Sequence, residues 1–155
     1  MGAPGERLVD ACVEAGVVGF DTMVFIYHFQ DDARYAPVTT DVLRALEEGL
    51  FHGVASTLLL TELLVHPLRA GAAAEARDIY VLLTSFPNLD LVAPDSRIAF
   101  RAAELRAEGR LRTPDALHLA TSAERGAAVF LTNDRRLRSS AVGLRVLLLE
   151  GDADA

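Results

Sequence analysis

Four acidic residues of this chain lie within or beside strongly apolar stretches, where an isolated charge is unfavourable. Asp21 separates VVGF from TMVFIYHF, and Glu62 interrupts TLLLTELLVHPL. Asp115 opens the helix-like segment TPDALHLATSA, and Asp134 ends AAVFLTND. A buried carboxylate destabilises a fold unless it is paired or bound to a cation. If the fold brings the four together, a divalent metal ion is the expected partner, because hard cations prefer oxygen ligands, and a metal held by acids suggests phosphate chemistry.

The elements that must position these acids follow from the alternation of short apolar runs with helical patterns. This alternation predicts an α/β domain built on a parallel sheet. Thr113 as a cap and Pro114 at the first helical position predict a helix start, and Pro67 predicts a helix end. The expected strands cover 17–20, 53–55, 89–92, 127–131 and 144–149. The expected helices cover 37–50, from 56 or 57 to about 66, 72–85, 95–108 and 113–125.

This layout predicts that the acids converge. In an open parallel sheet, ligands bind at the carboxyl ends of the strands. Asp21 follows the first strand and Asp134 follows the fourth, so both should lie on that edge. Asp115 falls in the first turn of its helix, where free N–H groups favour an anion. Glu62 lies about one turn into the helix after the second strand, so all four can line one cleft.

Each acid also has a simpler interpretation when it is taken alone. Asp115 is then an ordinary first-turn charge, and Asp134 is a helix cap after a strand. Asp21 would serve as a cap or turn residue. Glu62 is the hardest to explain in this way, because the surrounding leucines leave its helix almost no polar face.

Two further polar residues lie near the acids. His118 is one turn deeper than Asp115 on the same helix, where a core histidine is the more common outcome and a metal ligand the alternative. Thr132 either terminates its strand or uses its hydroxyl to orient a water molecule of the metal site. The sequence alone keeps both alternatives open.

Size and hydropathy predict one folded domain spanning residues 1–155. Hydrophobic residues make up 51% of the 155, and the mean hydropathy is +0.24, which excludes a disordered chain. We expect a core of about 17–149, an N-terminal extension of unassigned role at 1–15, and a frayed tail at 151–155. Charges, glycines and prolines interrupt every apolar stretch before it could span a membrane. Without a secretory signal pattern, the expected location is the cytoplasm, with no membrane partner.

Charge and residue usage exclude several classes of protein. The net charge of −7 argues against a general electrostatic attraction to nucleic acid. The chain has no lysine, and all fifteen basic residues are arginine, which excludes P-loop NTPases, pyridoxal enzymes and receiver domains that need a lysine. The single cysteine, Cys12, excludes an internal disulfide framework and a cysteine-based zinc site, so we expect it to be a small buried hydrophobe.

The segments FDTMVFIY, STLLLTELL, TPDALHLATSA and VFLTNDRRL resemble the PIN-domain nucleases, and in particular the VapC-type toxins of bacterial toxin–antitoxin pairs. The resemblance covers nearly the whole chain, with the acidic motifs in order. Any one motif is weak, but the four in order are specific. The resemblance implies a three-layer α/β/α fold whose parallel sheet has the strand order 3-2-1-4-5.

The resemblance also implies a function and a set of site residues. It implies a metal-dependent endoribonuclease that hydrolyses phosphodiester bonds of single-stranded RNA with Mg²⁺ or Mn²⁺, a homodimer, and a small antitoxin protein that inserts into the acidic cleft. The implied catalytic and metal-binding residues, in the order of the family's motifs, are Asp21, Glu62, Asp115 and Asp134, with Thr132 as the hydroxyl that precedes the last acid.

Arginines near these acids are the expected contacts for backbone phosphates. Arg112 precedes the helix of Asp115, and Arg135 and Arg136 follow Asp134 directly. Solvated surface charge is the alternative for each of them. Two alternatives to the toxin also remain: a catalytically silent PIN-like binding module, and a PIN nuclease that acts in RNA maturation or on DNA. The intact set of acids argues against the silent module, whereas the sequence does not separate substrates that share a phosphodiester.

Overall fold

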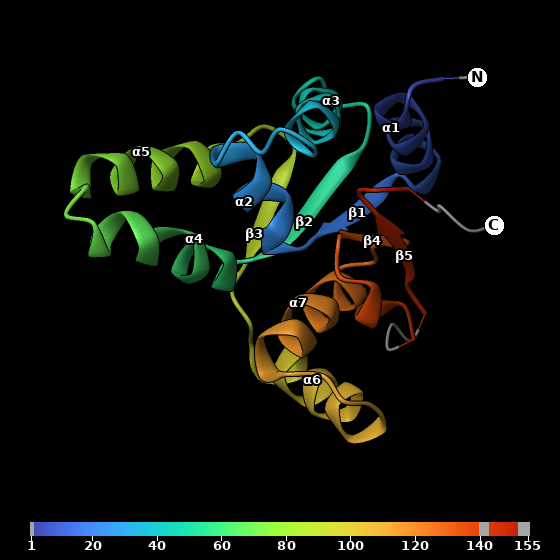
Figure 1. The fold of residues 1–155 in the computed structure, drawn as a ribbon. Coiled ribbons are helices and arrows are strands. Elements are labelled where there is room, and N and C mark those ends of the chain that lie inside the picture. The colour runs from blue at the N-terminus through green and yellow to red at the C-terminus, as the bar shows by residue number, and fades with distance from the viewer. Residues whose placement is uncertain (1, 140–142, 152–155) are drawn as a thin grey trace.

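The computed structural model describes residues 2–139 and 143–151. In this part of the chain, five strands form one parallel sheet with helices on both faces (Figure 1). The strands are β1 (Val17–Phe20), β2 (His52–Ser56), β3 (Leu89–Val92), β4 (Val129–Thr132) and β5 (Arg145–Leu148). The helices are α1 (Pro4–Ala15), α2 (Thr22–Phe29), α3 (Ala36–Glu47), α4 (Leu58–Arg69), α5 (Ala73–Thr84), α6 (Ser96–Glu108) and α7 (Thr113–Glu124), followed by a 3-10 helix, η1 (Arg135–Ser139).

The strand order is β3-β2-β1-β4-β5, and every neighbouring pair is parallel, which confirms the expected fold class and strand order. The chain builds outward from β1 to β3 on one side and then returns to add β4 and β5 on the other. The order therefore switches between β1 and β4, the position where open α/β sheets bind ligands. Phe20 pairs with Leu131 in the register, and the Asp21 N–H donates to the Leu131 carbonyl at 3.0 Å.

Two apolar cores lie on opposite faces of this sheet, because successive side chains of a strand alternate between its faces. Val18 and Phe20 belong to the core that the sheet shares with α1 to α5. Val54 and Phe130 belong to the second core, against α6 and α7. Figure 1 shows α6 and α7 together on one side of the strands. The three-layer arrangement fixes the start of α7, with Asp115, near the ends of β1 and β4.

Gly19 allows this close approach of α7 to β1. A Cβ atom added at Gly19 would lie 2.2 Å from the Oγ and 2.5 Å from the Cβ of Ser122 on α7. We therefore expect Gly19→Ala to lower the free energy of unfolding by about 1–3 kcal/mol, as overpacked cores do, when measured by denaturant titration. Ser122→Gly in the same chain removes both clashing atoms, so the double variant should regain part of the loss. A Gly19→Ala protein as stable as the wild type would contradict this contact.

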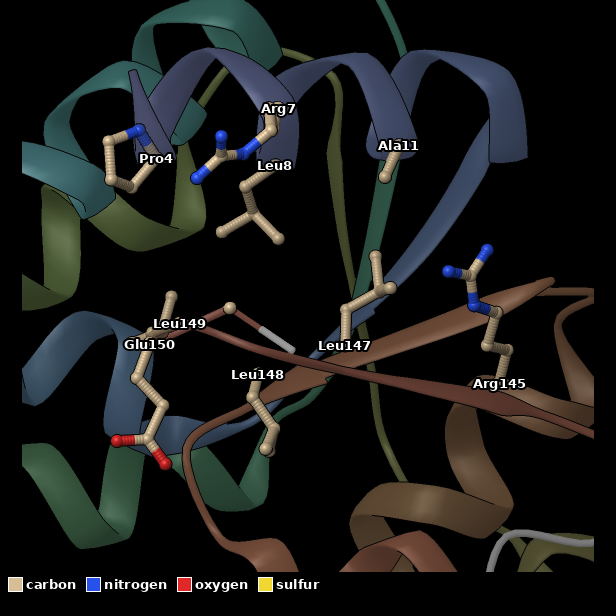
Figure 2. Close-up of a pocket in the computed structure, with 10 residues that line it drawn as sticks. Pro4, Arg7, Leu8, Ala11, Arg145, Leu147, Leu148, Leu149 and Glu150 are labelled. Carbon is tan, nitrogen blue, oxygen red and sulfur yellow. The ribbon is translucent and has the colours of Figure 1, made fainter. Parts of the chain in front are cut away.

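The N-terminal extension forms α1, which packs on α3 and β1 and contributes Leu8 and Cys12 to the first core. Cys12 is fully buried, which confirms its expected role, and burial raises the pKa of its thiol to about 12. A hollow of about 370 Å³ remains between α1 and β5, with Leu8 on the helix side and Leu147 on the strand side (Figure 2). Glu150 is the one acidic residue among its described lining residues, so this hollow does not have the cluster of acids expected of the site.

Apart from shifts of one to three residues at element ends, the local structure differs from the sequence prediction at the end of α4 and in three segments that were given no element, which form α1, α2 and η1. The helix α4 continues through Pro67 to Arg69 instead of ending before the proline. Pro67 lies in the last turn, so only two helical residues follow the point at which the proline disturbs the backbone. The apolar segment after Asp21 was given no element from the sequence, and it forms α2. Of the tail predicted to fray at 151–155, residues 152–155 lie outside the described residues, whereas the Gly151 N–H donates to the Leu148 carbonyl at 3.0 Å. Among the described helices, none has the length and apolar character that a membrane span needs.

Candidate active site

The four acids line one cavity of about 400 Å³ at the carboxyl ends of β1 and β4, as the sequence predicted for their placement. All three candidate arginines line the same cavity. Its described lining residues are Asp21, Thr22, Met23, Ile26, Glu62, Arg112, Asp115, Asn133, Asp134, Arg135 and Arg136. The role of these residues in catalysis or metal binding stays a prediction, whereas their convergence is a property of the fold.

Asp21 is the most deeply buried of the four acids, with 6% of its surface exposed. It is the N-cap of α2, where its Oδ1 accepts a hydrogen bond from the Thr22 N–H at 2.8 Å. Its Oδ2 accepts a hydrogen bond from the Thr132 hydroxyl at 2.6 Å. Burial raises the pKa of Asp21 above its usual value, and the hydrogen bonds from Thr132 and Thr22 oppose this only in part. Asp21 is therefore both a cap and a carboxyl group whose charge is unfavourable without a cation.

Thr132 has different contacts from those expected for a residue that orients water. It is fully buried, and its only proton is donated to Asp21. Its oxygen also accepts a hydrogen bond from the Asp134 N–H at 3.1 Å. These contacts support a role in which Thr132 positions Asp21 and links it to the turn that carries Asp134.

Glu62 projects from α4 and is less buried than its apolar surroundings predict, because 38% of its side chain is exposed. Its Oε1 accepts hydrogen bonds from the Thr22 hydroxyl at 3.0 Å and lies 2.5 Å from the Nε2 of His118. Burial acts to raise the pKa of Glu62, but the hydrogen bonds from His118 and Thr22 outweigh it and leave the pKa below its usual value. The carboxylate is thus held in its charged form beside the cavity.

Asp115 lies in the first turn of α7, and 16% of its side chain is exposed. Thr113 is the first helical residue instead of the expected cap, and Arg112 occupies the cap position without a side-chain cap. The start of this helix at residue 113 is thus as predicted, and only the cap differs. From the cap position, the Nε of Arg112 pairs with Asp115 Oδ2 at 3.3 Å. The carboxylate at the helix start therefore has a cationic partner in this structure.

Asp134 begins η1 by accepting a hydrogen bond from the Arg136 N–H at 3.0 Å, so its role as a helix cap is also realised. The Arg136 guanidinium pairs with the same carboxylate, with Nη2 and Oδ2 2.6 Å apart. These hydrogen bonds from Arg136 lower the pKa of Asp134 below its usual value. Arg135 pairs instead with Glu150, at 2.6 Å between Nε and Oε1.

The oxygen-rich lining has the right donor chemistry for a hard divalent cation. In the side-chain positions of the described residues, however, no three acidic, histidine or cysteine residues are arranged closely enough to hold a metal ion. Asp115 and Asp134 instead pair with Arg112 and Arg136. The residues therefore fit a metal in type and location, and a metal ion held by Asp115 or Asp134 would share these carboxylates with the arginines.

Sequence reasoning missed Thr22 and treated His118 as more often structural. Thr22 is buried, and it donates two hydrogen bonds to the acids: its hydroxyl donates to Glu62 and its backbone N–H donates to Asp21. The signal was available, because Thr22 directly follows the first acid and precedes the apolar run MVFI. His118 is buried and contacts both Glu62 and Thr22, so it faces the acids rather than only the core.

The chain belongs to the PIN domain family, because the model of that family matches residues 19–142. PIN domains are nucleases that generally depend on a metal ion. No sequence among the curated proteins matches this chain significantly.

Solved structures provide a separate comparison. The chain is similar to VapBC2 from Rickettsia felis bound to a DNA fragment from its promoter, with a TM-score of 0.68 at 15% identity over 85% of this chain and 98% of that one. It is similar to a toxin–antitoxin complex from Klebsiella pneumoniae, with a TM-score of 0.59 at 23% identity over 83% and 94% of the two chains. DNA-bound VapBC from Salmonella typhimurium matches with a TM-score of 0.63 at 18% identity over 86% and 97%. At these identities the likeness establishes the fold.

Proposed function

We propose that this protein is a metal-dependent endoribonuclease that hydrolyses single-stranded RNA, and that it is the toxin of a toxin–antitoxin pair. The observation that carries the proposal is the convergence of four carboxylates on one cavity at the switch point of a PIN-domain sheet. Asp21 adds weight, because a buried carboxyl with a raised pKa needs a cation to be stable in its charged form.

Asp21 and Asp115 are the proposed principal ligands of one or two Mg²⁺ or Mn²⁺ ions, with Glu62 and Asp134 completing the site. When bound, the metal lowers the pKa of water and offsets the charge of the phosphodiester. In the reaction, a water oxygen bonds to phosphorus and the P–O3′ bond breaks. The products are a 5′-phosphate and a 3′-hydroxyl, the latter taking up a proton. Thr132 contributes by holding Asp21 in place through its hydrogen bond.

The arginines at the cavity are the proposed contacts for the RNA backbone. Arg112 and Arg136 pair with Asp115 and Asp134 in this structure. If these carboxylates held a metal ion, the guanidinium groups of Arg112 and Arg136 would still line the cavity, where they could contact a phosphate. Guanidinium groups bind phosphate oxygens through two parallel hydrogen bonds, which suits this role. Arg135 also lines the cavity and is proposed as a weaker contributor, since it pairs with Glu150.

The proposed partners are a small antitoxin and a second copy of the chain. Support for the antitoxin comes from the similar structures, two of which are VapBC complexes with DNA and one a toxin–antitoxin complex. An acidic cavity also suits a basic inhibitor segment, because complementary charge directs association. The homodimer rests on the resemblance to VapC-type toxins, and we propose the cytoplasm as the site of action.

The experiment that tests this function compares cleavage of labelled single-stranded RNA with single-stranded DNA of the same sequence. The protein should cut RNA with Mg²⁺ or Mn²⁺, lose cleavage in EDTA, and leave 5′-phosphate ends that can be ligated. Preferential cutting of DNA would identify the alternative substrate class. Absence of cleavage of either polymer and of total cellular RNA, by a protein that binds Mn²⁺, would instead favour a silent binding module.

A further inference from the structure

His118 is a buried imidazole that uses only one of its two nitrogens. Its Nε2 lies 2.5 Å from Glu62 Oε1 and 3.2 Å from the Thr22 Oγ1, while Nδ1 is buried with no partner in the described part of the chain. A buried polar atom without a partner destabilises a fold. An apolar side chain of similar size would fill this position without that cost, so packing alone does not account for a histidine here.

The direction of the hydrogen bonds at Glu62 can be assigned. An ionised carboxylate only accepts, so the Nε2 of His118 carries the proton in this contact. The Thr22 hydroxyl donates to the same oxygen at 3.0 Å. Both donors therefore meet at the same oxygen, Oε1. The carboxylate is fixed through one oxygen and keeps the other available to the cavity that Glu62 lines.

This contact completes a continuous chain of hydrogen bonds across four elements. The Thr22 N–H donates to Asp21 at 2.8 Å, while its hydroxyl donates to Glu62. Thr132 holds the other oxygen of Asp21. Glutamate has a long side chain, and one that is 38% exposed would otherwise sample several rotamers. The donors on α2 and α7 fix the Glu62 side chain when the protein folds. The entropy of ordering this side chain is therefore not lost again when an ion binds.

We infer that His118 is a positioning residue whose Nε2–H, together with the Thr22 hydroxyl, holds one oxygen of Glu62 so that the other can bind a divalent cation in the acidic cavity. This inference rests on the proposed function, because it takes Glu62 to be one of the residues that bind the cation. His118 itself touches neither the cation nor the RNA.

The test measures the affinity of the purified protein for Mn²⁺ by isothermal titration, without any nuclease assay. His118→Leu should weaken Mn²⁺ binding by roughly 10–100-fold, the scale for residues that orient metal ligands. His118→Gln should recover most of this affinity, because its amide nitrogen can donate from a similar place. His66→Leu is the matched control on the exposed side of α4 and should bind as the wild type does. Circular dichroism verifies that each variant is folded.

A double-mutant cycle separates positioning from a general structural effect. If His118 acts through Glu62, then His118→Leu combined with Glu62→Gln should bind Mn²⁺ no more weakly than Glu62→Gln alone. The inference would be overturned if the two losses of Mn²⁺ affinity multiplied in the double variant. It would also be overturned if His118→Leu bound Mn²⁺ as tightly as the wild type. If His118→Leu does not fold, Thr22→Val removes the second donor and should show the same dependence on Glu62. If the wild-type protein binds no Mn²⁺, the proposed function itself is contradicted. If the wild type and His118→Leu both bind Mn²⁺ normally, only the role of His118 is contradicted.

Discussion

Replacing Asp21 with asparagine should abolish RNA cleavage and, in the absence of metal, make the folded protein more stable. Even residues that only orient metal ligands are worth roughly 10–100-fold, so losing a proposed ligand should reduce cleavage by more than about 100-fold. The stability gain follows from burial, which makes the charged Asp21 unfavourable and raises its pKa. Asparagine removes the charge and keeps an acceptor for the Thr22 N–H, but it loses the acceptor for the Thr132 hydroxyl. We therefore expect a small net gain, with a rise in Tm of at most about 2–4 °C.

The matched control for this variant is Asp78→Asn on the exposed surface of α5, which should change neither cleavage nor Tm appreciably. Retained cleavage in highly purified Asp21→Asn protein would remove Asp21 from the site. A large loss of stability in metal-free buffer would instead show that the carboxylate is needed for the fold. The two measurements together therefore separate a functional acid from a structural one.

The same variant predicts how stability depends on pH. A group whose pKa is raised in the folded state favours folding while it is protonated, and this contribution is lost as pH rises through its folded pKa. For metal-free protein, the advantage of Asp21→Asn over the wild type should thus be largest near neutral pH. It should shrink as pH falls through the raised pKa of Asp21 toward its ordinary value of 3.8. Glu62 and Asp134 have lowered pKa values and act in the opposite direction, but they are common to both proteins and cancel in the difference.

The second large effect is stabilisation by metal. A ligand that binds only the folded state stabilises it by about 2.7 kcal/mol at a concentration one hundred times its Kd. For a chain of this size that corresponds to a rise in Tm of about 5–10 °C, measured by thermal unfolding with increasing Mn²⁺. EDTA should reverse the shift, and Asp21→Asn should lose most of it. An equal shift in the wild type and in Asp21→Asn would mean that Mn²⁺ binds elsewhere on this acidic protein.

Much of the fold was predictable because the signals are local. The period of the apolar residues separates strands from helices, and β3 was located to the residue from the run LDLV. Pro67 shows the limit of such signals, since its effect depends on its distance from the helix end. The helix α2 was not predicted because apolar residues lie on all of its faces, so the sequence has no alternation of polar and apolar residues at helical spacing. It is covered by the core on one side and, through Met23 and Ile26, borders the cavity.

The sequence by itself determined which residues could form the site and that they would meet. Asp21 and Asp134 follow strands, and parallel strands end at a common edge, so their convergence follows from chain order and sheet geometry. Only the tertiary structure decided which side chains hold these acids. His118 and Thr22 reach Glu62 from two other helices, across sequence separations of 56 and 40 residues, and Thr132 reaches Asp21 across 111. Hydrogen bonds depend on atom positions within a fraction of an ångström, and those positions are set by packing between elements.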